Sequence, residues 1–299
     1  MSTRNLVICG LVAAVLGGSV TYAVIRGSKS GQAGTTGATR TSDMSGMTSE
    51  PTSGSGSMAG MLAVGDVSGL NSSADGYTLE LASKTLTVAK RTRFSFRVVH
   101  SDDRPVRAFQ IDATKMMHLI IVRRDLTSYQ HVHPSMAPDG TWSIAVAVGV
   151  PGNYRAFADF ATGGKRHVLG VNLKAPGATT TTPLPPPRTT VRVDGYSVTF
   201  QTGMLMAGSE ASLHFTVTRA GTPVTNLQHY LGNLGHLVII RERTLQYLHV
   251  HPTSIGGGGP DIHFTGELAH AGRYRAFLQF QIKGRVHTAA FTLRAHAGG

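Results

Sequence analysis

The sequence is poor in cysteine, in charged residues and in helical patterning. Its single cysteine, Cys9, excludes an intrachain disulfide framework. Charged residues make up only 15 % of the chain, whereas glycine occurs 36 times, and this balance favours short strands and turns over long charged helices. After the N-terminal stretch, no segment shows the apolar period that marks an amphipathic helix. The chain also lacks a Gly-x-Ser-x-Gly elbow, a P-loop and a dinucleotide-binding fingerprint, which argues against the enzyme classes that use them.

The N-terminal stretch is a long apolar run. Residues 5–25 are almost uncharged, and about 20 apolar residues are enough for a helix to cross a bilayer. We therefore expect residues 1–26 to form an uncleaved single-pass anchor in the cell membrane, with the following domains outside the cytoplasm. A cleaved signal peptide that ends near Thr21-Tyr22-Ala23 is the alternative.

Two spacers of biased composition divide the rest of the chain. Residues 27–61 are mainly Gly, Ser, Thr and Met, which predicts a disordered linker. Residues 176–190 are rich in Thr and Pro, which is typical of an extended, semi-rigid linker. These boundaries leave residues 62–175 and 191–296 as two domains. The first spacer also carries thioethers, which are either soft Cu(I) ligands or part of a low-complexity tail: Met44, Met47, Met58 and Met61.

The two domains repeat one sequence pattern. Residues 118–134 and 236–252 each begin with a histidine and end in His-Val-His-Pro, and the first histidine precedes the pair by 13 residues in both. A second block, Gly-x-Tyr-Arg-Ala-Phe-x-x-Phe, begins at Gly152 and again at Gly272, and another histidine follows each of its tyrosines by 13 residues. Each copy can therefore bring four imidazoles toward one region.

The patterning between the spacers is that of β-strands. Residues 92–98, 141–146 and 213–217 alternate between apolar and polar side chains, and Asp139-Gly140 marks a turn. Seven or more short strands in each domain predict an immunoglobulin-like β-sandwich. The second block is typical of a core strand, and its tyrosine can also act as the corner residue of such a sandwich. We expect an all-β protein with two tandem immunoglobulin-like antiparallel β-sandwiches behind an N-terminal transmembrane helix and a flexible linker.

Strand geometry indicates how the histidines of one copy meet. A two-residue turn at Asp125-Leu126 would place His118 directly opposite His133 in a hairpin. His131 and His133 are two residues apart, so they lie on the same face of a strand. We predict one metal site in each domain, with copper as Cu(I) or Cu(II) favoured and zinc as the alternative. The candidate ligands are His118, His131, His133, His167, His236, His249, His251 and His287, and the candidate soft ligands near the first site are Met116, Met117 and Met136.

Residues 118–134 and 152–160 resemble the YtkA-like/FixH-like β-sandwich domains of exported bacterial proteins. They are most similar to a group of actinobacterial membrane-anchored proteins that often accompany copper or heavy-metal handling genes. The resemblance covers most of residues 75–175 and, more weakly, 193–295. It implies an extracytoplasmic immunoglobulin-like fold and an association with metal handling, and it implies no established reaction.

The His-x-His pairs also resemble cupin metal sites, in which a glutamate follows a few residues later. Here the corresponding positions hold Ala137 and Pro138, so no carboxylate completes a two-histidine-one-carboxylate triad. We therefore expect a metal-binding protein for metal handling or delivery, without enzymatic activity.

The chain carries a formal net charge of +12 and has a pI of about 10.3, which attracts it to anionic surfaces. No nucleic-acid-binding module is visible, so we expect no nucleic-acid partner. The expected partners are a metal ion, the membrane through the anchor, and envelope copper proteins or anionic cell-wall polymers. The alternative function is a basic cell-envelope interaction module, in which the histidines are structural and no metal binds.

Overall fold

The computed structural model describes residues 69–253 and 256–298, and the regular elements in these ranges are β-strands. In the same ranges, no helix is long and apolar enough to span a bilayer. The expected anchor at residues 1–26, the linker at 27–61 and the four methionines of that linker lie outside the described residues. The described part of the chain is all-β, as the sequence predicted.

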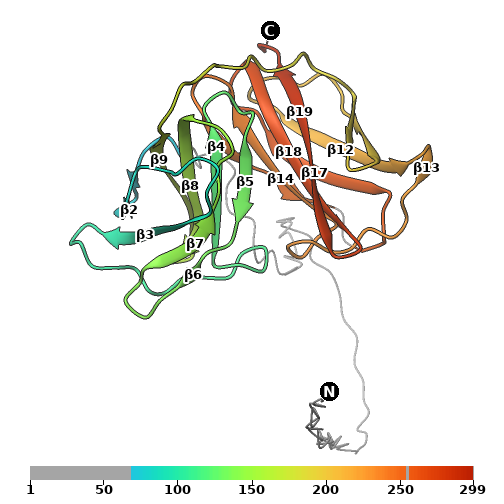
Figure 1. Ribbon diagram of the computed structural model, residues 1–299. Coiled ribbons are helices and arrows are strands. Elements are labelled where there is room, and N and C mark those ends of the chain that lie inside the picture. The colour runs from blue at the N-terminus through green and yellow to red at the C-terminus, as the bar shows by residue number, and fades with distance from the viewer. Residues whose placement is uncertain (1–68, 254–255, 299) are drawn as a thin grey trace, which may run out of the picture. The chain divides into compact units, whose positions relative to one another are not determined.

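The first repeat consists of two antiparallel sheets (Figure 1), with strand orders β1-β2-β3-β7-β6 and β5-β4-β8-β9. We call this set of strands repeat one. Its strands are β1 (Ser73–Ala74), β2 (Tyr77–Leu81), β3 (Thr92–His100), β4 (Met117–Arg123), β5 (Tyr129–Val132), β6 (Ser135–Met136), β7 (Trp142–Val146), β8 (Gly152–Thr162) and β9 (Lys165–Ala175).

The second repeat has the same architecture, with sheets β10-β11-β12-β17-β16 and β15-β14-β18-β19, and β13 pairs with β12. We call it repeat two, and the tandem repeat predicted from the sequence is confirmed. Its strands are β10 (Thr190–Val193), β11 (Tyr196–Gln201), β12 (Glu210–Arg219), β13 (Thr222–Pro223), β14 (Gly235–Arg241), β15 (Tyr247–His249), β16 (His251–Pro252), β17 (Asp261–Glu267), β18 (Gly272–Ile282) and β19 (Arg285–Ala295).

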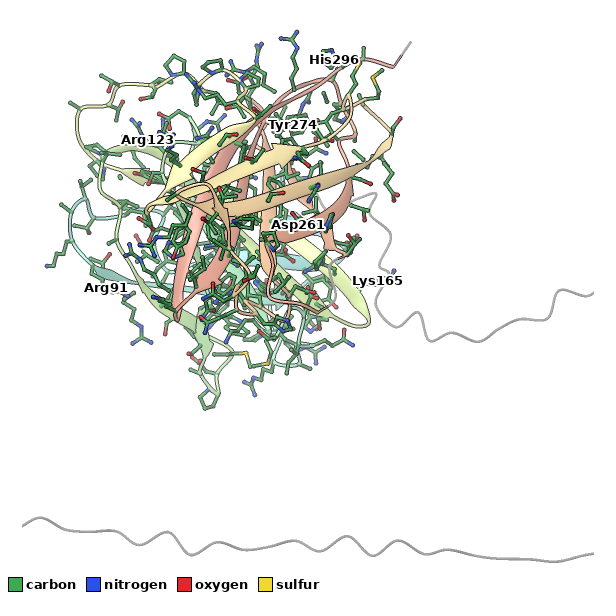
Figure 2. All side chains as sticks on the ribbon, turned by 90° about the vertical axis from the view of Figure 1, so that its right-hand side faces the viewer. Arg91, Arg123, Lys165, Asp261, Tyr274 and His296 are labelled. Atoms are coloured by element: carbon green, nitrogen blue, oxygen red, sulfur yellow. The ribbon has the colours of Figure 1, made fainter. Side chains whose placement is uncertain are left out.

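Alternating side chains build a separate apolar core inside each repeat. In β3, Phe94, Phe96 and Val98 are buried, while the residues between them are exposed or half-buried, because successive side chains of a strand point to opposite faces. Phe96 is the register partner of Trp142, which is also buried. Charged side chains such as Arg91 and Lys165 are exposed (Figure 2). Each repeat is therefore a β-sandwich with its own hydrophobic centre.

Both repeats contain a tyrosine corner. The hydroxyl of Tyr154 donates to the carbonyl of Val150 at 2.7 Å, and the hydroxyl of Tyr274 donates to the carbonyl of His270 at 2.6 Å. Each tyrosine lies near the start of a long strand and bonds to the backbone four residues upstream, which is the arrangement that fastens a corner in immunoglobulin-like sandwiches. The prediction for the tyrosines of the second sequence block is confirmed.

A third apolar cluster joins the two repeats. All seven residues of β4 are buried, although an antiparallel sheet commonly leaves one face to water. Leu119 and Ile121 face the core of repeat one, whereas Ile120 and Val122 pack in the cluster shared with repeat two. The shared cluster comprises Ile120, Val122, Leu126, Phe157, Val168, Leu184, Val238, Ile240, Leu245, Tyr247 and Phe277. Both repeats belong to one compact unit.

The middle of the Thr/Pro linker contacts both repeats. Arg123 donates to the carbonyl of Thr180 at 2.6 Å, and the amide of Thr182 donates to the carboxylate of Asp125 at 3.1 Å. Leu184 is buried in the shared cluster, and its carbonyl accepts a hydrogen bond of 2.7 Å from Arg273. Residues 176–189 of the linker form no strand, as the composition predicted, and only Thr190 enters β10. Repeat one contacts the linker at Thr180 and Thr182, and Arg273 of repeat two contacts it at Leu184 and Pro185.

Separate cores and a shared cluster together predict how isolated repeats behave. Fragments 62–176 and 189–297 should each unfold cooperatively, because each contains a complete sandwich core. Each should also self-associate or bind the other fragment, because separation exposes the apolar face of the shared cluster. Thermal unfolding and sedimentation of the two fragments, alone and mixed, check this expectation. An unfolded fragment would mean that the shared cluster is indispensable to that repeat.

Candidate metal centre

The histidine hairpins have the register that the sequence predicted. In repeat one, Leu119 pairs with Val132, so His118 and His133 form the next opposed pair at the open end of the hairpin. Strands β14 and β15 of repeat two pair in the same register. The register matters because a shift of one residue would turn His118 into the core of repeat one. Instead, His118 shares its face with Ile120 and Val122, which is the face that meets repeat two.

Four imidazoles come together at the edge of the shared cluster. The ring centroids of His118, His131 and His133 lie 4.7–5.2 Å apart. His236 of repeat two lies 4.7 Å from His131 and 5.6 Å from His118. One nitrogen each of His118, His131 and His236 lies within 4.8 Å of the others, and all three side chains are buried. The structure thus combines, in one centre, histidines that the sequence assigned to two separate sites.

Hydrogen bonds determine which ring nitrogens carry protons. Nε2 of His118 lies 3.1 Å from the backbone carbonyl oxygen of Asp112, which can only accept, so Nε2 carries the hydrogen. Nδ1 of His131 lies 2.7 Å from Oε1 of Gln279, whose amide nitrogen faces the hydroxyl of Thr288 at 3.4 Å. Nδ1 of His131 therefore donates to Gln279. These two contacts fix the tautomers of both rings when the rings are neutral.

The remaining nitrogens of the two rings face each other. Nδ1 of His118 and Nε2 of His131 are 3.0 Å apart, and in the neutral tautomers both present a lone pair. Two nitrogens that bind one ion at about 2.0–2.1 Å in tetrahedral geometry lie about 3.3 Å apart. The observed spacing is therefore close to that of two ligands on a single ion. A proton or a metal cation between the two nitrogens would turn their repulsion into attraction.

Burial disfavours protonation of these imidazoles. Burial lowers the pKa of His131 well below 6.5, and the neighbouring imidazoles of His236, His118 and His133 act in the same direction. Burial also lowers the pKa of His118, although the nearby carboxylate of Asp159 opposes this effect. The pKa of His133 falls to about 4, mainly through burial. These three imidazoles are therefore neutral at physiological pH, which is the state in which imidazoles bind metal.

A charged network lies next to the cluster. Asp159 is the register partner of His118 on β8, and its carboxylate accepts hydrogen bonds of 2.9 Å from both the Tyr247 hydroxyl and Arg166. Arg166 also forms an ion pair with Asp112. Burial raises the pKa of Asp159 to about 6, against the opposing effects of His118 and the Tyr247 hydroxyl. A carboxylate beside the imidazoles stabilises a cation bound there.

The fourth histidine of each copy lies in a different environment. Nδ1 of His167 is 3.3 Å from the carboxylate of Asp75, and its ring packs 4.8 Å from Tyr77. Nδ1 of His287 is 2.8 Å from the carboxylate of Asp194. Both histidines are buried. Neither belongs to the group of metal-spaced ligands found in the described ranges, and each is oriented by its own carboxylate.

His251 and the three methionines near the hairpins lie in different surroundings. His251 is half-buried, and its pKa is lowered by burial and by Arg166. Met117 is buried in the core of repeat one, Met136 packs against that core, and Met116 is 41 % exposed. The side chain of His249 lies outside what the structure describes.

Two polar residues that support the imidazoles, Asp159 beside His118 and Gln279 bonded to His131, were not predicted from the sequence. Asp159 and Gln279 occupy the same position of the repeated Gly-x-Tyr-Arg-Ala-Phe block, and each is the register partner of the first histidine of its repeat. A signal for their role was present in the sequence. The uninterrupted apolar runs 119–122 and 237–240 indicate strands buried on both faces, so polar residues paired with those strands were candidates for the second buried face.

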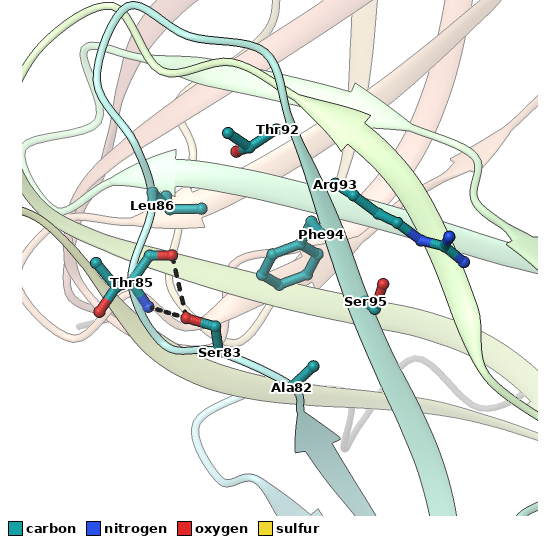
Figure 3. Close-up of a pocket in the computed structure, with 8 residues that line it drawn as sticks. All are labelled: Ala82, Ser83, Thr85, Leu86, Thr92, Arg93, Phe94 and Ser95. Carbon is teal, nitrogen blue, oxygen red and sulfur yellow. Dashed lines mark hydrogen bonds between the residues drawn. The ribbon is translucent and has the colours of Figure 1, made fainter.

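Two surface cavities of the described residues lie away from the histidine cluster. The hollow in Figure 3 is lined by residues 82–83, 85–86 and 92–95. A larger groove of about 510 Å³ is lined in part by Phe200, Met204 and His296. Neither is lined by a histidine of the cluster, in which His118, His131 and His236 are buried and His133 is half-buried.

Comparisons with known proteins give a family and no activity. No curated protein matches the sequence. A mutant alpha-2-macroglobulin of Salmonella is 10 % identical with a TM-score of 0.27, and the match covers 78 % of this chain and 15 % of that one. The FdeC adhesin of Escherichia coli is 12 % identical with a TM-score of 0.24, and the match covers 76 % of this chain and 65 % of that one. Titin domains z1z2 in complex with telethonin are 13 % identical with a TM-score of 0.20, and the match covers 76 % of this chain and 100 % of that one. The model of a family described as a domain of unknown function (DUF8832) matches residues 72–177 and 190–297, once in each repeat, and the chain therefore belongs to that family.

Proposed function

We propose that this protein binds a transition metal ion, with copper favoured, through His118, His131 and His236, and that His133 is an additional ligand. The observation that carries the proposal is the 3.0 Å approach of two buried imidazole nitrogens whose tautomers leave a lone pair on each. Buried polar groups normally have partners. A metal ion supplies a partner to both nitrogens without the cost of burying an imidazolium.

The donor set favours copper and keeps zinc as the alternative. Imidazole is a borderline ligand that suits both ions. Asp159, the buried carboxylate beside the cluster, shares the Arg166 guanidinium with Asp112, so the network keeps one net negative charge with which to neutralise an added cation. A monovalent Cu(I) ion brings half the charge of Zn(II) into this low-dielectric site, where uncompensated charge is costly. This charge balance supports Cu(I).

The burial of the centre supports binding rather than catalysis. Catalytic metal sites keep a position open for water or substrate, whereas closed sites hold their ion. The three candidate ligands are at most 8 % exposed. We therefore propose a non-enzymatic role in holding or delivering a metal ion outside the cytoplasm, next to the membrane that the N-terminal segment is expected to enter.

The location is tested by fractionation. The full-length protein should remain in the membrane pellet after carbonate washing, because an apolar helix is not released by high pH or salt. Protease added to spheroplasts should digest the domains. Release of a mature form that begins near residue 24 would instead identify a cleaved signal peptide.

Histidine variants test the ligand set. Replacement of His131 and His133 together by alanine, or of His236 alone, should weaken Cu(I) and Zn(II) binding by more than about 100-fold, since loss of a second-layer partner alone costs 10–100-fold. Competition titration against a chromophoric chelator gives the affinities. Because the ligands serve one centre, both variants should lose the same binding event.

The matched control is His229→Ala, which replaces an exposed histidine of repeat two and should bind metal like the wild type. Circular dichroism and thermal unfolding establish that each variant is folded. If folded variants with either set of substitutions bind copper and zinc like the wild type, the metal function is excluded, and a basic envelope-binding module becomes the better explanation.

The pH dependence of metal affinity follows from the lowered pKa values. Protons compete with metal only below the pKa of each imidazole, and burial places those of His118, His131 and His133 below 6.5. The affinity should therefore be nearly constant from pH 8 to 6.5 and fall as the pH drops from there toward 4. Protonation of Asp159, with a pKa of about 6, acts in the same direction. A steep loss between pH 8 and 7 would contradict a buried imidazole site.

A further inference from the structure

The interface between the repeats has apolar sides and a polar centre. Tyr129 of repeat one stacks on Phe277 of repeat two with ring centroids 4.0 Å apart, and Phe157 packs against Tyr247 at 5.4 Å in the equivalent contact. These pairs are related by the internal repeat, so the interface resembles that of a symmetric dimer. Aromatic contact and apolar burial favour docking of the repeats whether or not metal is bound.

Two hydrogen bonds of the polar centre, from His131 to Gln279 and from Tyr247 to Asp159, join the repeats, whereas its facing imidazole nitrogens oppose docking when metal is absent. Nδ1 of His118 and Nε2 of His131 face each other within one hairpin of repeat one, and docking buries them beside His236 of repeat two. Among the described residues, Nε2 of His133 and the hydroxyl of Tyr129 are buried without a hydrogen-bond partner. Each unsatisfied buried polar group carries a desolvation penalty. Separation of the repeats would return these atoms to water and remove the penalty.

The contacts of the linker with the two repeats divide at Pro183, which gives the repeats a point about which they can separate. Its contacts to repeat one, at Thr180 and Thr182, lie on one side of Pro183. Its contacts to Arg273 of repeat two, at Leu184 and Pro185, lie on the other side. A change at the peptide bonds around Pro183 can therefore rotate the repeats apart while each keeps its own part of the linker.

We propose that the metal ion is a removable staple between the two repeats: bound metal closes the interface, and loss of metal opens it and exposes the apolar faces of β4 and β14. The inference rests on the proposed function, since it assigns a consequence to metal at the same site. The ligands come from both repeats, so the ion can bind them all only in the docked state. By linkage, metal strengthens docking by the same factor by which docking strengthens metal binding.

Spin labels on the two repeats test the proposal directly. The full-length chain would carry nitroxides at Lys165→Cys and Arg285→Cys, two exposed positions on different repeats, in a Cys9→Ala background. Pulsed electron–electron double resonance gives the distribution of distances between the two nitroxides, without metal and with the diamagnetic ions Cu(I) or Zn(II). We expect a broad distribution without metal that narrows to one distance with metal, corresponding to at least a tenfold change in the ratio of closed to open molecules. His236→Ala should stay broad with metal, and the His229→Ala control should narrow.

Reciprocity gives a second test that leaves the ligands intact. Phe277→Ala removes an interface contact and no ligand. It should broaden the distribution of nitroxide distances and weaken metal binding about tenfold, the same factor by which it weakens docking of the repeats. Phe200→Ala, in the core of repeat two, is the matched control and should leave metal affinity unchanged in the folded protein.

The possible outcomes distinguish the proposal of a metal-dependent interface from the proposal of metal binding. Narrowing by metal together with weaker binding in Phe277→Ala supports the staple. Metal binding that leaves the distance distribution unchanged, with wild-type affinity in Phe277→Ala, overturns the staple and leaves the metal function standing. Absence of metal binding in the folded wild-type chain overturns both.

Discussion

The arrangement of this protein depends on two apolar strands, β4 and β14, that are buried on both faces. One face of each strand closes the core of its own repeat, and the other face packs in the cluster shared by the two repeats. Because side chains alternate along a strand, the histidine that precedes each apolar run shares the face that meets the other repeat. The burial of Ile120 and Val238 at the interface therefore also brings His118 and His236 together.

Sequence repetition has produced a centre whose two halves differ. Asp159 and Gln279 are equivalent in the repeat, yet Asp159 joins an ionic network with Arg166 and Tyr247, while Gln279 holds the neutral His131. A carboxylate at both positions would bury two negative charges in one interface, which is costly without further cations. Divergence at this single position gives the interface one charged half and one neutral half.

Much of the fold could be predicted from local patterning. Alternation of apolar residues predicted the strands, and the second sequence block offered a tyrosine near a strand start for the corner of each sandwich, where both tyrosines are found. The hairpin register, which sets His118 opposite His133, followed from the turn position alone. These features involve residues close in sequence or joined by one turn, so pleat and turn geometry are sufficient to specify them.

The sequence by itself determined that two sandwiches would form and that His118, His131 and His133 would share one face of a hairpin. Only the tertiary structure decided that this face is buried against the other repeat, so that His236 completes the cluster and His167 and His287 pair with Asp75 and Asp194 instead. The physical reason is that docking of the repeats depends on the combined shape of two sheets more than 100 residues apart in the chain. Local periodicity shows that a strand has a second apolar face, and it does not show which surface covers that face.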